Sequence, residues 1–350
     1  MSQNLILSFF KRHGYSESDW EACSDAARCA YPSYLIRSVE PQGYCSYTVR
    51  ASTKDGAEGE DRIIQFRPQQ YALDLGIIDA AKDIYQSYAP KVAECMVPGV
   101  PAGLKVYELD VITGVPYQSW YRRKKELDGE AWEKQVRLTK DFAAFVARAW
   151  PSDVKNSKRR ECDGKVGANI SSKLQQLTKK LPSAFLRSRA QQAVTALPLL
   201  DRLPVVLNHG DVNPSNIIVD PYTGRLNGLV DWAEAEWLAF GTCLYGLEFL
   251  LGWQEHSSKQ REFTYYDRAE LLRKLFWEEL QVRIPDLAGI NSTEMMDSVI
   301  LARDVGVFLW YGFAWDEGKI DRVVNPENDP EEVTCLEAFL TSGDATSFRL

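Results

Sequence analysis

The sequence lacks closely spaced metal-binding residues and long hydrophobic runs. It has 350 residues but only three histidines, and its seven cysteines form no C-x2-C pair. A zinc cluster of Cys and His is therefore not expected, and an odd number of cysteines without a framework is typical of free thiols in a reducing compartment. Near the N-terminus the apolar residues are interrupted at 11–13, before they reach the length of a signal or membrane span. We expect a cytoplasmic protein with no membrane partner.

Basic residues are also sparse. The formal net charge is −8, and residues 121–125 form the longest basic run. Nucleic acid is therefore a poor partner, whereas a cationic or neutral small molecule can approach more easily than a polyanion. The sequence has no internal repeat and no Walker A motif. With 45% hydrophobic residues, the chain can bury a sizeable core.

The segment 207–216 contains the most informative motif, His209-x-Asp211 followed by four residues and Asn216, with Asp231 fifteen residues further on. Protein kinases have the same spacing, in which the first Asp takes the acceptor's proton and the Asn and second Asp bind magnesium. Taken singly, each residue also fits a core position or a turn. One short segment that presents all of them favours phosphoryl transfer, with Asp211 and His209 as the catalytic residues.

The residues between Asn216 and Asp231 predict a hairpin. Residues 217–219 form an apolar run typical of a buried strand, 220–224 is typical of a turn, and 226–230 predicts a returning strand. Such a hairpin would place Asp231 beside Asn216, where an amide oxygen and a carboxylate could bind Mg²⁺.

These residues resemble the aminoglycoside phosphotransferase and choline kinase group, which has a protein-kinase-like fold. Two further stretches, 42–49 and 230–236, resemble a subgroup common in fungi. The resemblance implies ATP or GTP as the phosphoryl donor, Mg²⁺ as the metal, and a small hydroxylated or amine-bearing acceptor. Residues 241–251 follow Asp231 almost directly and look like an apolar helix, so the activation segment of a protein kinase has no room here.

The order of the predicted elements agrees with this resemblance. Helical patterns at 1–30 are followed by strand patterns at 35–39, 45–51 and 63–67, then by a helix at 73–88 and a strand at 106–111; helical patterns dominate the remaining chain, at 132–150, 173–180, 184–196, 267–280 and 298–310. We predict an α+β, bilobal fold with a small β-rich lobe, residues 1–108, and a large helical lobe, residues 109–350.

Residues 43–46 would cover the phosphates of the nucleotide. Gly43 would permit a close approach of the backbone, and Ser46 could meet a phosphate oxygen, although one glycine also fits an ordinary hairpin turn. Arg67 stands where kinases place the phosphate-binding Lys, and an arginine can bind phosphate in a bidentate manner. Gln65 lies on the same strand face and is the alternative.

Two further elements would complete the nucleotide site. The acidic partner of the phosphate-binding cation would be Asp79, with Asp83 one turn later as the alternative. Both also fit an exposed helix face. Residues 108–112, which include Glu108 and Asp110, would supply backbone contacts to the base.

For the acceptor, the carboxylates of Glu234 and Glu236 follow the predicted metal ligand closely. Trp315 and Asp316 belong to an aromatic and acidic cluster that also contains Trp310 and Tyr311. Aromatic rings with carboxylates suit an amine. The aromatic residues also fit a packed helix face, and Glu234 could instead position the hairpin.

The sequence therefore predicts a phosphotransferase that uses ATP or GTP with Mg²⁺ on a small-molecule acceptor. Two alternatives remain open: a non-catalytic nucleotide-binding scaffold, suggested by the poor glycine turn, and a pathway enzyme that phosphorylates its substrate to drive elimination or cyclisation. The identity of the acceptor and the oligomeric state are left open.

Overall fold

The computed structural model describes residues 2–40, 42–53, 60–152, 161–255, 262–289 and 292–341. The chain divides into two compact units, Met1–Ile112 and Thr113–Leu350, here called the first and second units. The predicted boundary at 108/109 lies four residues before the division between these units, within the strand that ends at Asp110.

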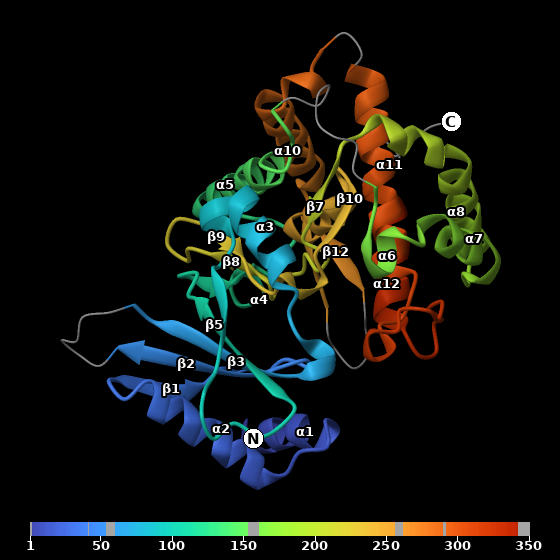
Figure 1. The fold of residues 1–350 in the computed structure, drawn as a ribbon. Helices are drawn as coiled ribbons and strands as arrows, with labels where there is room; N and C mark the ends of the chain where they lie inside the picture. Colours follow the sequence, from blue (N-terminus) through green and yellow to red (C-terminus); the bar gives the residue numbers. More distant parts are fainter. Residues whose placement is uncertain are drawn as a thin grey trace. The chain divides into compact units, whose positions relative to one another are not determined.

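The first unit contains one antiparallel sheet with the strand order β1-β2-β3-β5-β4 (Figure 1). The strands are β1 (Tyr34–Ser38), β2 (Tyr47–Thr53), β3 (Arg62–Pro68), β4 (Val92–Cys95) and β5 (Leu104–Asp110). The sequence patterns predicted four of them. They missed β4, a four-residue edge strand with two exposed positions.

Two N-terminal helices cover one face of this sheet. They are α1 (Ser2–Arg12) and α2 (Glu17–Ala30), and α2 begins at a capping box between Ser16 and Asp19. Their apolar residues join apolar positions of β2, β3 and β5 in one core: Ile6, Phe9, Phe10, Cys23, Ala27, Tyr47, Val49, Ala51, Ile64, Phe66 and Val106. Each large side chain contributes about 1.5–3 kcal/mol by burial. The opposite sheet face carries polar residues, and α3 (Leu75–Tyr85) follows β3.

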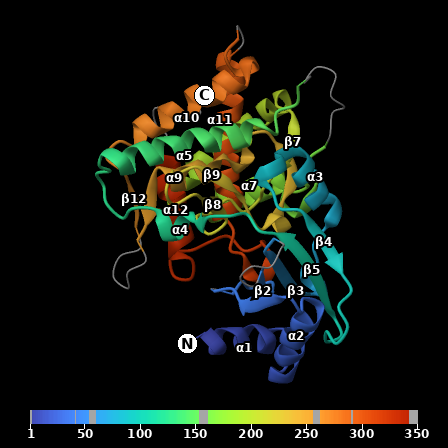
Figure 2. The same ribbon diagram turned by 90° about the vertical axis from the view of Figure 1, so that its left-hand side faces the viewer.

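Helices dominate the second unit, in which the long helices α5 and α10 pack side by side (Figure 2). The helices are α4 (Tyr117–Trp120), α5 (Gly129–Ala147), α6 (Gly164–Gly167), α7 (Ile170–Lys180), α8 (Ala184–Ala196), α9 (Leu247–Leu250), α10 (Ala269–Arg283), α11 (Ser292–Tyr311) and α12 (Pro330–Thr341). The strands form three small antiparallel sheets, β6-β8-β9, β7-β10 and β11-β12. They are β6 (Val115–Pro116), β7 (Val205–Asn208), β8 (Ile217–Val219), β9 (Leu226–Leu229), β10 (Glu236–Ala239), β11 (Gly252–Gln254) and β12 (Phe263–Tyr265).

The apolar segment 241–251 is not the helix that its composition suggested. It begins at Gly241 with a φ of 99°, continues as a 3-10 turn over Thr242–Gly246, and only then forms the four-residue α9. A Cβ at Gly246 would lie 2.2 Å from Val212 Cγ1. The segment therefore departs from a regular helix where it packs closely against the predicted catalytic loop.

A buried ionic network joins the helices of this unit, and no sequence pattern predicted it. Glu248 binds Arg273 and Arg303, and Arg303 also binds Asp304. Burial alone would raise the pKa of Glu248, but Arg273 and Arg303 outweigh it and lower the pKa to about 2. Glu248 is therefore charged, and its buried charge is paired as physical chemistry requires. None of the helices in the described ranges is long and apolar enough to span a membrane.

Candidate active site

The predicted catalytic loop is anchored at its start by Asn208, the last residue of β7. Its amide nitrogen donates to the carbonyls of Val206 and Leu238, at 3.0 and 3.1 Å. Its amide oxygen accepts the N–H of Cys243 at 3.0 Å. Asn208 thus ties β7, β10 and the 3-10 turn together at the point where the loop begins. The sequence analysis missed it, although a polar residue at the end of an apolar strand was a signal.

His209 shapes the loop from inside the core. Its Nε2 lies 3.0 Å from the Val230 carbonyl, and its Nδ1 accepts the backbone N–H of Asp211 at 3.2 Å. Because a carbonyl only accepts, Nε2 carries the proton. Burial lowers the pKa of His209 to about 3, so the ring is neutral. It packs on Trp232 with ring centroids 4.5 Å apart. His209 therefore joins the loop to the residue preceding Asp231.

Asp211 is held by two side-chain amides. Asn213 donates to Oδ1 at 2.9 Å, and Asn216 donates to Oδ2 at 2.8 Å. Burial raises the pKa of Asp211 to about 6, and the charge of Asp231 contributes in the same direction. A carboxylate whose pKa lies near neutrality is suited to accept a proton and to release it again.

Asn216 and Asp231 are brought together by the β8-β9 hairpin. The Val230 N–H donates to the Asn216 carbonyl at 2.9 Å, which continues the pairing of the two strands. Asp231 has a φ of 62° and a ψ of 69°, a left-handed conformation that is uncommon outside glycine, although Asp tolerates it. The predicted hairpin is thus present, and it places the two predicted metal ligands at neighbouring positions.

The donor set fits magnesium. The nitrogen of the Asn216 amide is used on Asp211, so its oxygen is the atom available to a cation. Within the described ranges, no group of three His, Cys, Asp or Glu side chains could hold a metal ion. Magnesium commonly takes one or two protein oxygens and completes its shell with phosphate oxygens and water. Two oxygen donors therefore suit a metal that arrives with a nucleotide.

Glu234 contacts the loop through its backbone. Gly210 has a φ of 79°, and a Cβ there would lie 1.8 Å from the Glu234 carbonyl oxygen. Only glycine fits this position. The charge of Glu234 also contributes to the raised pKa of Asp211. Glu234 therefore lies near Asp211, and its backbone helps to position the hairpin, as the alternative interpretation held.

The remaining residues expected to bind the acceptor have structural partners. Both oxygens of Glu236 accept the N–H of Val166, and Oε2 also accepts that of Gly167 at 2.9 Å. Asp316 pairs with Arg322 at 2.8 Å. Trp315 follows α11 and is 37% exposed. We therefore interpret Glu236 as an anchor of α6, and Asp316 as part of the ion pair that closes the segment after α11.

Tyr245 supports the catalytic loop from behind and had no signal in the sequence. Its hydroxyl accepts the N–H of Val212 at 3.0 Å, and its ring stacks on Trp310 with centroids 5.1 Å apart. Burial raises the pKa of Tyr245, and the charge of Asp211 adds to the effect. Trp310 and Tyr311 both contact Tyr245, a position that agrees with the packed-face interpretation of these two aromatic residues.

In the first unit, the predicted phosphate-binding residues share the polar face of the sheet. Thr48 pairs with Gln65 across β2 and β3, and the alternation of strands puts Ser46 and Arg67 on the same face. Ser46 Oγ lies 3.1 Å from Thr48 Oγ1. Arg67 is buried and donates to Gln65 Oε1 at 3.0 Å and to the Tyr71 carbonyl at 2.8 Å. The two alternatives, Arg67 and Gln65, are thus hydrogen-bonded to each other.

Two other predictions for the first unit do not agree with the geometry. Gly43 does not have a positive φ, and a Cβ there would find Ser46 Oγ at an ordinary 3.7 Å, so no steric reason requires glycine. Asp79 is exposed on α3. The exposed-face interpretation of Asp79 agrees with its position.

Glu108 and Asp110 lie within β5 and at its end. The Glu108 side chain binds Tyr31 and, at 3.3 Å, Arg62, so it points to the face covered by α2. The Asp110 N–H already donates to the Lys91 carbonyl at 3.0 Å. β5 pairs with β3 on one side and with β4 on the other. Of the segment 108–112, which was predicted to contact the base, only residues 111–112 lie beyond the strand.

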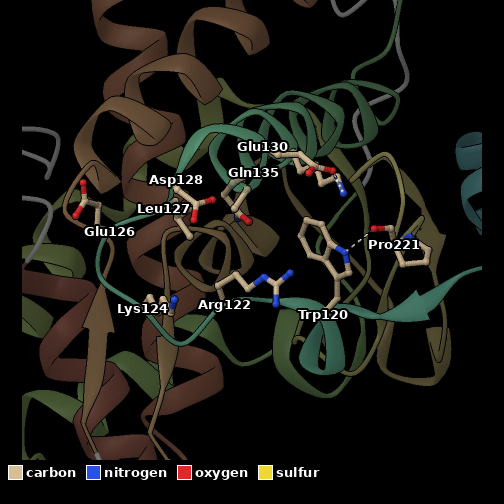
Figure 3. A pocket seen from close by; sticks show the side chains of 11 residues that line it. Trp120, Arg122, Lys124, Glu126, Leu127, Asp128, Glu130, Gln135 and Pro221 are labelled. Atoms are coloured by element: carbon tan, nitrogen blue, oxygen red, sulfur yellow. Dashed lines mark hydrogen bonds and ion pairs between the residues drawn. The ribbon is translucent and has the colours of Figure 1, made fainter.

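A pocket of about 220 Å³ lies elsewhere in the second unit, beside α4, the segment that leads into α5, and Pro221 (Figure 3). Trp120 donates its Nε1–H to the Pro221 carbonyl at 3.1 Å. Arg122, Asp128 and Gln135 also line the pocket, and none of the predicted site residues does. It is therefore distinct from the catalytic loop.

The sheet of the first unit, the helical second unit and the loop around Asp211 together define a phosphotransferase with a protein-kinase-like fold, as the sequence predicted. A model of the phosphotransferase enzyme family matches residues 41–238, more than half of the chain. The protein therefore belongs to this family. No curated protein matches the sequence.

One solved structure supports the fold, and two more are similar over most of the chain at lower TM-scores. The macrolide 2'-phosphotransferase of Brachybacterium faecium is 16% identical and has a TM-score of 0.51, with 91% of this chain and 98% of that chain covered. The ethanolamine kinase of Plasmodium vivax is 12% identical with a TM-score of 0.49, covering 88% of this chain and 82% of that chain. The aminoglycoside phosphotransferase of Streptomyces rimosus in complex with ADP and streptomycin is 15% identical with a TM-score of 0.43, covering 82% and 98%. At 16% identity, the likeness to the macrolide phosphotransferase shows the fold alone.

Proposed function

We propose that this protein transfers the terminal phosphoryl group of ATP or GTP, with Mg²⁺, to a hydroxyl or amine of a small molecule. The observation that carries the proposal is the state of Asp211. Two amides hold its carboxylate, and its pKa is raised to about 6 in the loop that leads to Asp231. This reaction requires the protein mainly to align the reactants and to stabilise charge on the phosphates, and an oriented carboxylate whose pKa lies near neutrality can align the acceptor and take its proton.

In this mechanism Asp211 accepts a hydrogen bond from the acceptor's hydroxyl and takes its proton. The acceptor oxygen forms a bond to the terminal phosphorus, the bond to the bridging oxygen breaks, and the nucleoside diphosphate leaves with that oxygen's electron pair. Asn213 and Asn216 keep the carboxylate oriented throughout. His209 remains neutral and holds the loop, because its pKa of about 3 excludes proton transfer near pH 7.

The metal would be held by the amide oxygen of Asn216 and the carboxylate of Asp231. When bound, Mg²⁺ neutralises charge on the phosphates. In the first unit Arg67, Gln65 and Ser46 would meet phosphate oxygens from the polar face of the sheet.

We expect amine-bearing compounds among the acceptors. Asp231 and Glu234 both contribute to the raised pKa of Asp211, so several carboxylates lie near the reacting group. Together with the net charge of −8, they favour a cationic acceptor over an anionic one.

The test is to incubate the purified protein with γ-labelled ATP or GTP, Mg²⁺ and a panel of hydroxylated and amine-bearing metabolites. We expect transfer of label to one class of acceptor, and no transfer with Asp211→Ala or after removal of Mg²⁺ by a chelator. No transfer by the wild type across a broad panel would contradict the proposal. Nucleotide binding without any background hydrolysis would instead favour the non-catalytic alternative, and mass spectrometry that finds loss of water from the acceptor would favour the elimination alternative.

A further inference from the structure

The end of α1 contacts the turn that precedes β2. Both N-terminal helices lie before residue 41, outside the part of the chain that matches the family model. Phe9 and Phe10 fix α1 in the core of the sheet. Arg12 ends this helix and His13 follows it. Both residues contact Tyr44, which lies in the middle of residues 42–46.

His13 contacts the turn in two ways. Its Nε2 lies 3.0 Å from the Tyr44 carbonyl oxygen and must donate, because a carbonyl can only accept. Its ring meets the Tyr44 ring edge-on, with centroids 5.7 Å apart and an interplanar angle of 86°. The Arg12 guanidinium lies 4.1 Å from the centroid of the Tyr44 ring. A hydrogen bond, a ring contact and a cation–π contact thus hold one residue of the turn.

The same histidine also contacts the residue that holds Arg67. The rings of His13 and Tyr71 have centroids 5.4 Å apart, and Tyr71 also meets Tyr44 edge-on at 6.2 Å. The backbone carbonyl of Tyr71 accepts Arg67 Nε at 2.8 Å. One aromatic cluster, formed by His13, Tyr44 and Tyr71, therefore touches both parts of the proposed phosphate site.

The base of the turn is held by one of its own residues. The Gln42 side chain bonds to the Val39 carbonyl and to both backbone groups of Thr48. Gly43 does not impose a special conformation, and the sequence has no glycine-rich loop. Tyr44, in the middle of the turn, is contacted by Arg12 and His13 at the end of α1 and by Tyr71.

We propose that His13 is a positioning residue for the nucleotide phosphates: it orders residues 42–46 and, through Tyr71, Arg67. This inference rests on the proposed function, since it assumes that the turn and Arg67 meet the phosphates. It adds to that function a part of the chain outside the matched family region. It also predicts that changes at His13 weaken phosphate binding without affecting the base of the nucleotide.

The experiment measures the affinities of Mg-ATP and adenosine by calorimetry for the wild type, His13→Ala, His13→Gln and Lys11→Ala. Lys11 is exposed on the same helix and serves as the matched control. For His13→Ala we expect the Kd of Mg-ATP to rise about 3- to 10-fold, the size of one hydrogen bond and a ring contact. Adenosine affinity should not change, because adenosine has no phosphate. His13→Gln restores a donor and should recover part of the loss, and Lys11→Ala should bind as the wild type does.

Several outcomes would overturn the inference. They are an unchanged Mg-ATP affinity in His13→Ala, or an equal loss for ATP and adenosine, which would mean general loosening of the unit. Arg12→Gln, an exposed change, should weaken Mg-ATP binding about 2-fold, so the test does not depend on the folding of the alanine variant. If the wild type binds neither Mg-ATP nor Mg-GTP, the proposed function itself fails, and this inference fails with it.

Discussion

The catalytic loop of the second unit and the turn 42–46 of the first unit are held in opposite ways. In the loop, Asp211, Asn213 and Asn216 bond to one another, and His209 bonds to Val230 only 21 residues away. In the turn, Tyr44 is held by His13, 31 residues earlier in the chain and on a helix. The side chains that hold the Asp211 carboxylate lie within the loop and can be read as a motif, although Asn208 and Tyr245 also tie the loop to distant residues. Contacts with a remote element leave no motif to read, and this explains why the residues around Asp211 were predictable and the support of Tyr44 was not.

The largest effect should come from removing the base inside the self-contained loop. We expect Asp211→Asn to lower the rate of phosphoryl transfer about 10²- to 10⁴-fold, because it removes general base catalysis and turns a donor toward Asn213 or Asn216. Transfer of label from ATP measures the effect. Tyr222→Phe, an 84% exposed position in the same hairpin, is the control and should retain full activity. A loss smaller than tenfold in Asp211→Asn would break the assignment of the loop.

The cores of the two units also differ. The core of the first unit is an apolar cluster, whereas the core of the second unit contains the buried charge of Glu248, paired with Arg273. Arg273 and Arg303 overcome the effect of burial and hold the pKa of Glu248 at about 2, below its ordinary 4.5. Its contribution to stability is therefore complete above pH 4.5 and is lost as the pH falls toward 2. Acid should weaken the second unit first.

We expect Glu248→Gln to destabilise the protein by about 3–5 kcal/mol at pH 7, because two buried arginines lose their partner. Urea unfolding followed by circular dichroism at pH 7 and pH 3 measures this. The variant should also lose much of the wild type's sensitivity to acid. Glu270→Gln is the control, because Glu270 pairs with Arg273 at 3.4 Å but its side chain is 64% exposed. Equal acid sensitivity in the wild type and Glu248→Gln would contradict the assignment.

The close packing of the loop against the Glu234 carbonyl can be tested by comparing alanine substitutions at two glycines. Gly210→Ala places a Cβ 1.8 Å from the Glu234 carbonyl at a positive φ, and we expect a loss of about 2–3 kcal/mol in stability together with most of the activity. Gly129→Ala, at the start of α5, meets no atom within 4 Å and should be neutral or slightly stabilising. Thermal unfolding of the two variants measures the difference. Similar melting temperatures would argue against the strained turn.

The smallest effect should arise where the first unit holds the start of β2. The Tyr47 hydroxyl bonds with Trp20 Nε1 at 3.1 Å, Ser24 Oγ at 3.2 Å and Ser38 Oγ at 3.1 Å. We expect Tyr47→Phe to cost about 1 kcal/mol and to raise the KM for ATP about twofold, with kcat unchanged. Thermal unfolding and steady-state kinetics measure the two effects. A fall in kcat of tenfold or more would show that the first unit affects the chemical step and would weaken the comparison.

Much of the fold followed from patterns within single elements. The alternation in β2 and β3 and the helical periodicity of α5 and α11 identified those elements, and the α+β class was correct. The short edge strand β4, the strand β10, which pairs with β7 about thirty residues away, and the helix α12 were missed. The apolar segment after Asp231 was predicted as a helix, because its composition does not reveal that Gly246 must fit against Val212.

The sequence by itself determined the catalytic loop, because the partners of Asp211 and His209 lie within about twenty residues, and a hairpin of this length brings them together. Only the tertiary structure decided what surrounds that loop. In the folded protein, the Glu236 carboxylate accepts a hydrogen bond from α6, the Tyr245 hydroxyl accepts one from Val212, and His13 bonds to the Tyr44 carbonyl. The physical reason is that hydrogen bonds between near neighbours follow from local geometry. Contacts across tens of residues depend on how whole helices and strands pack.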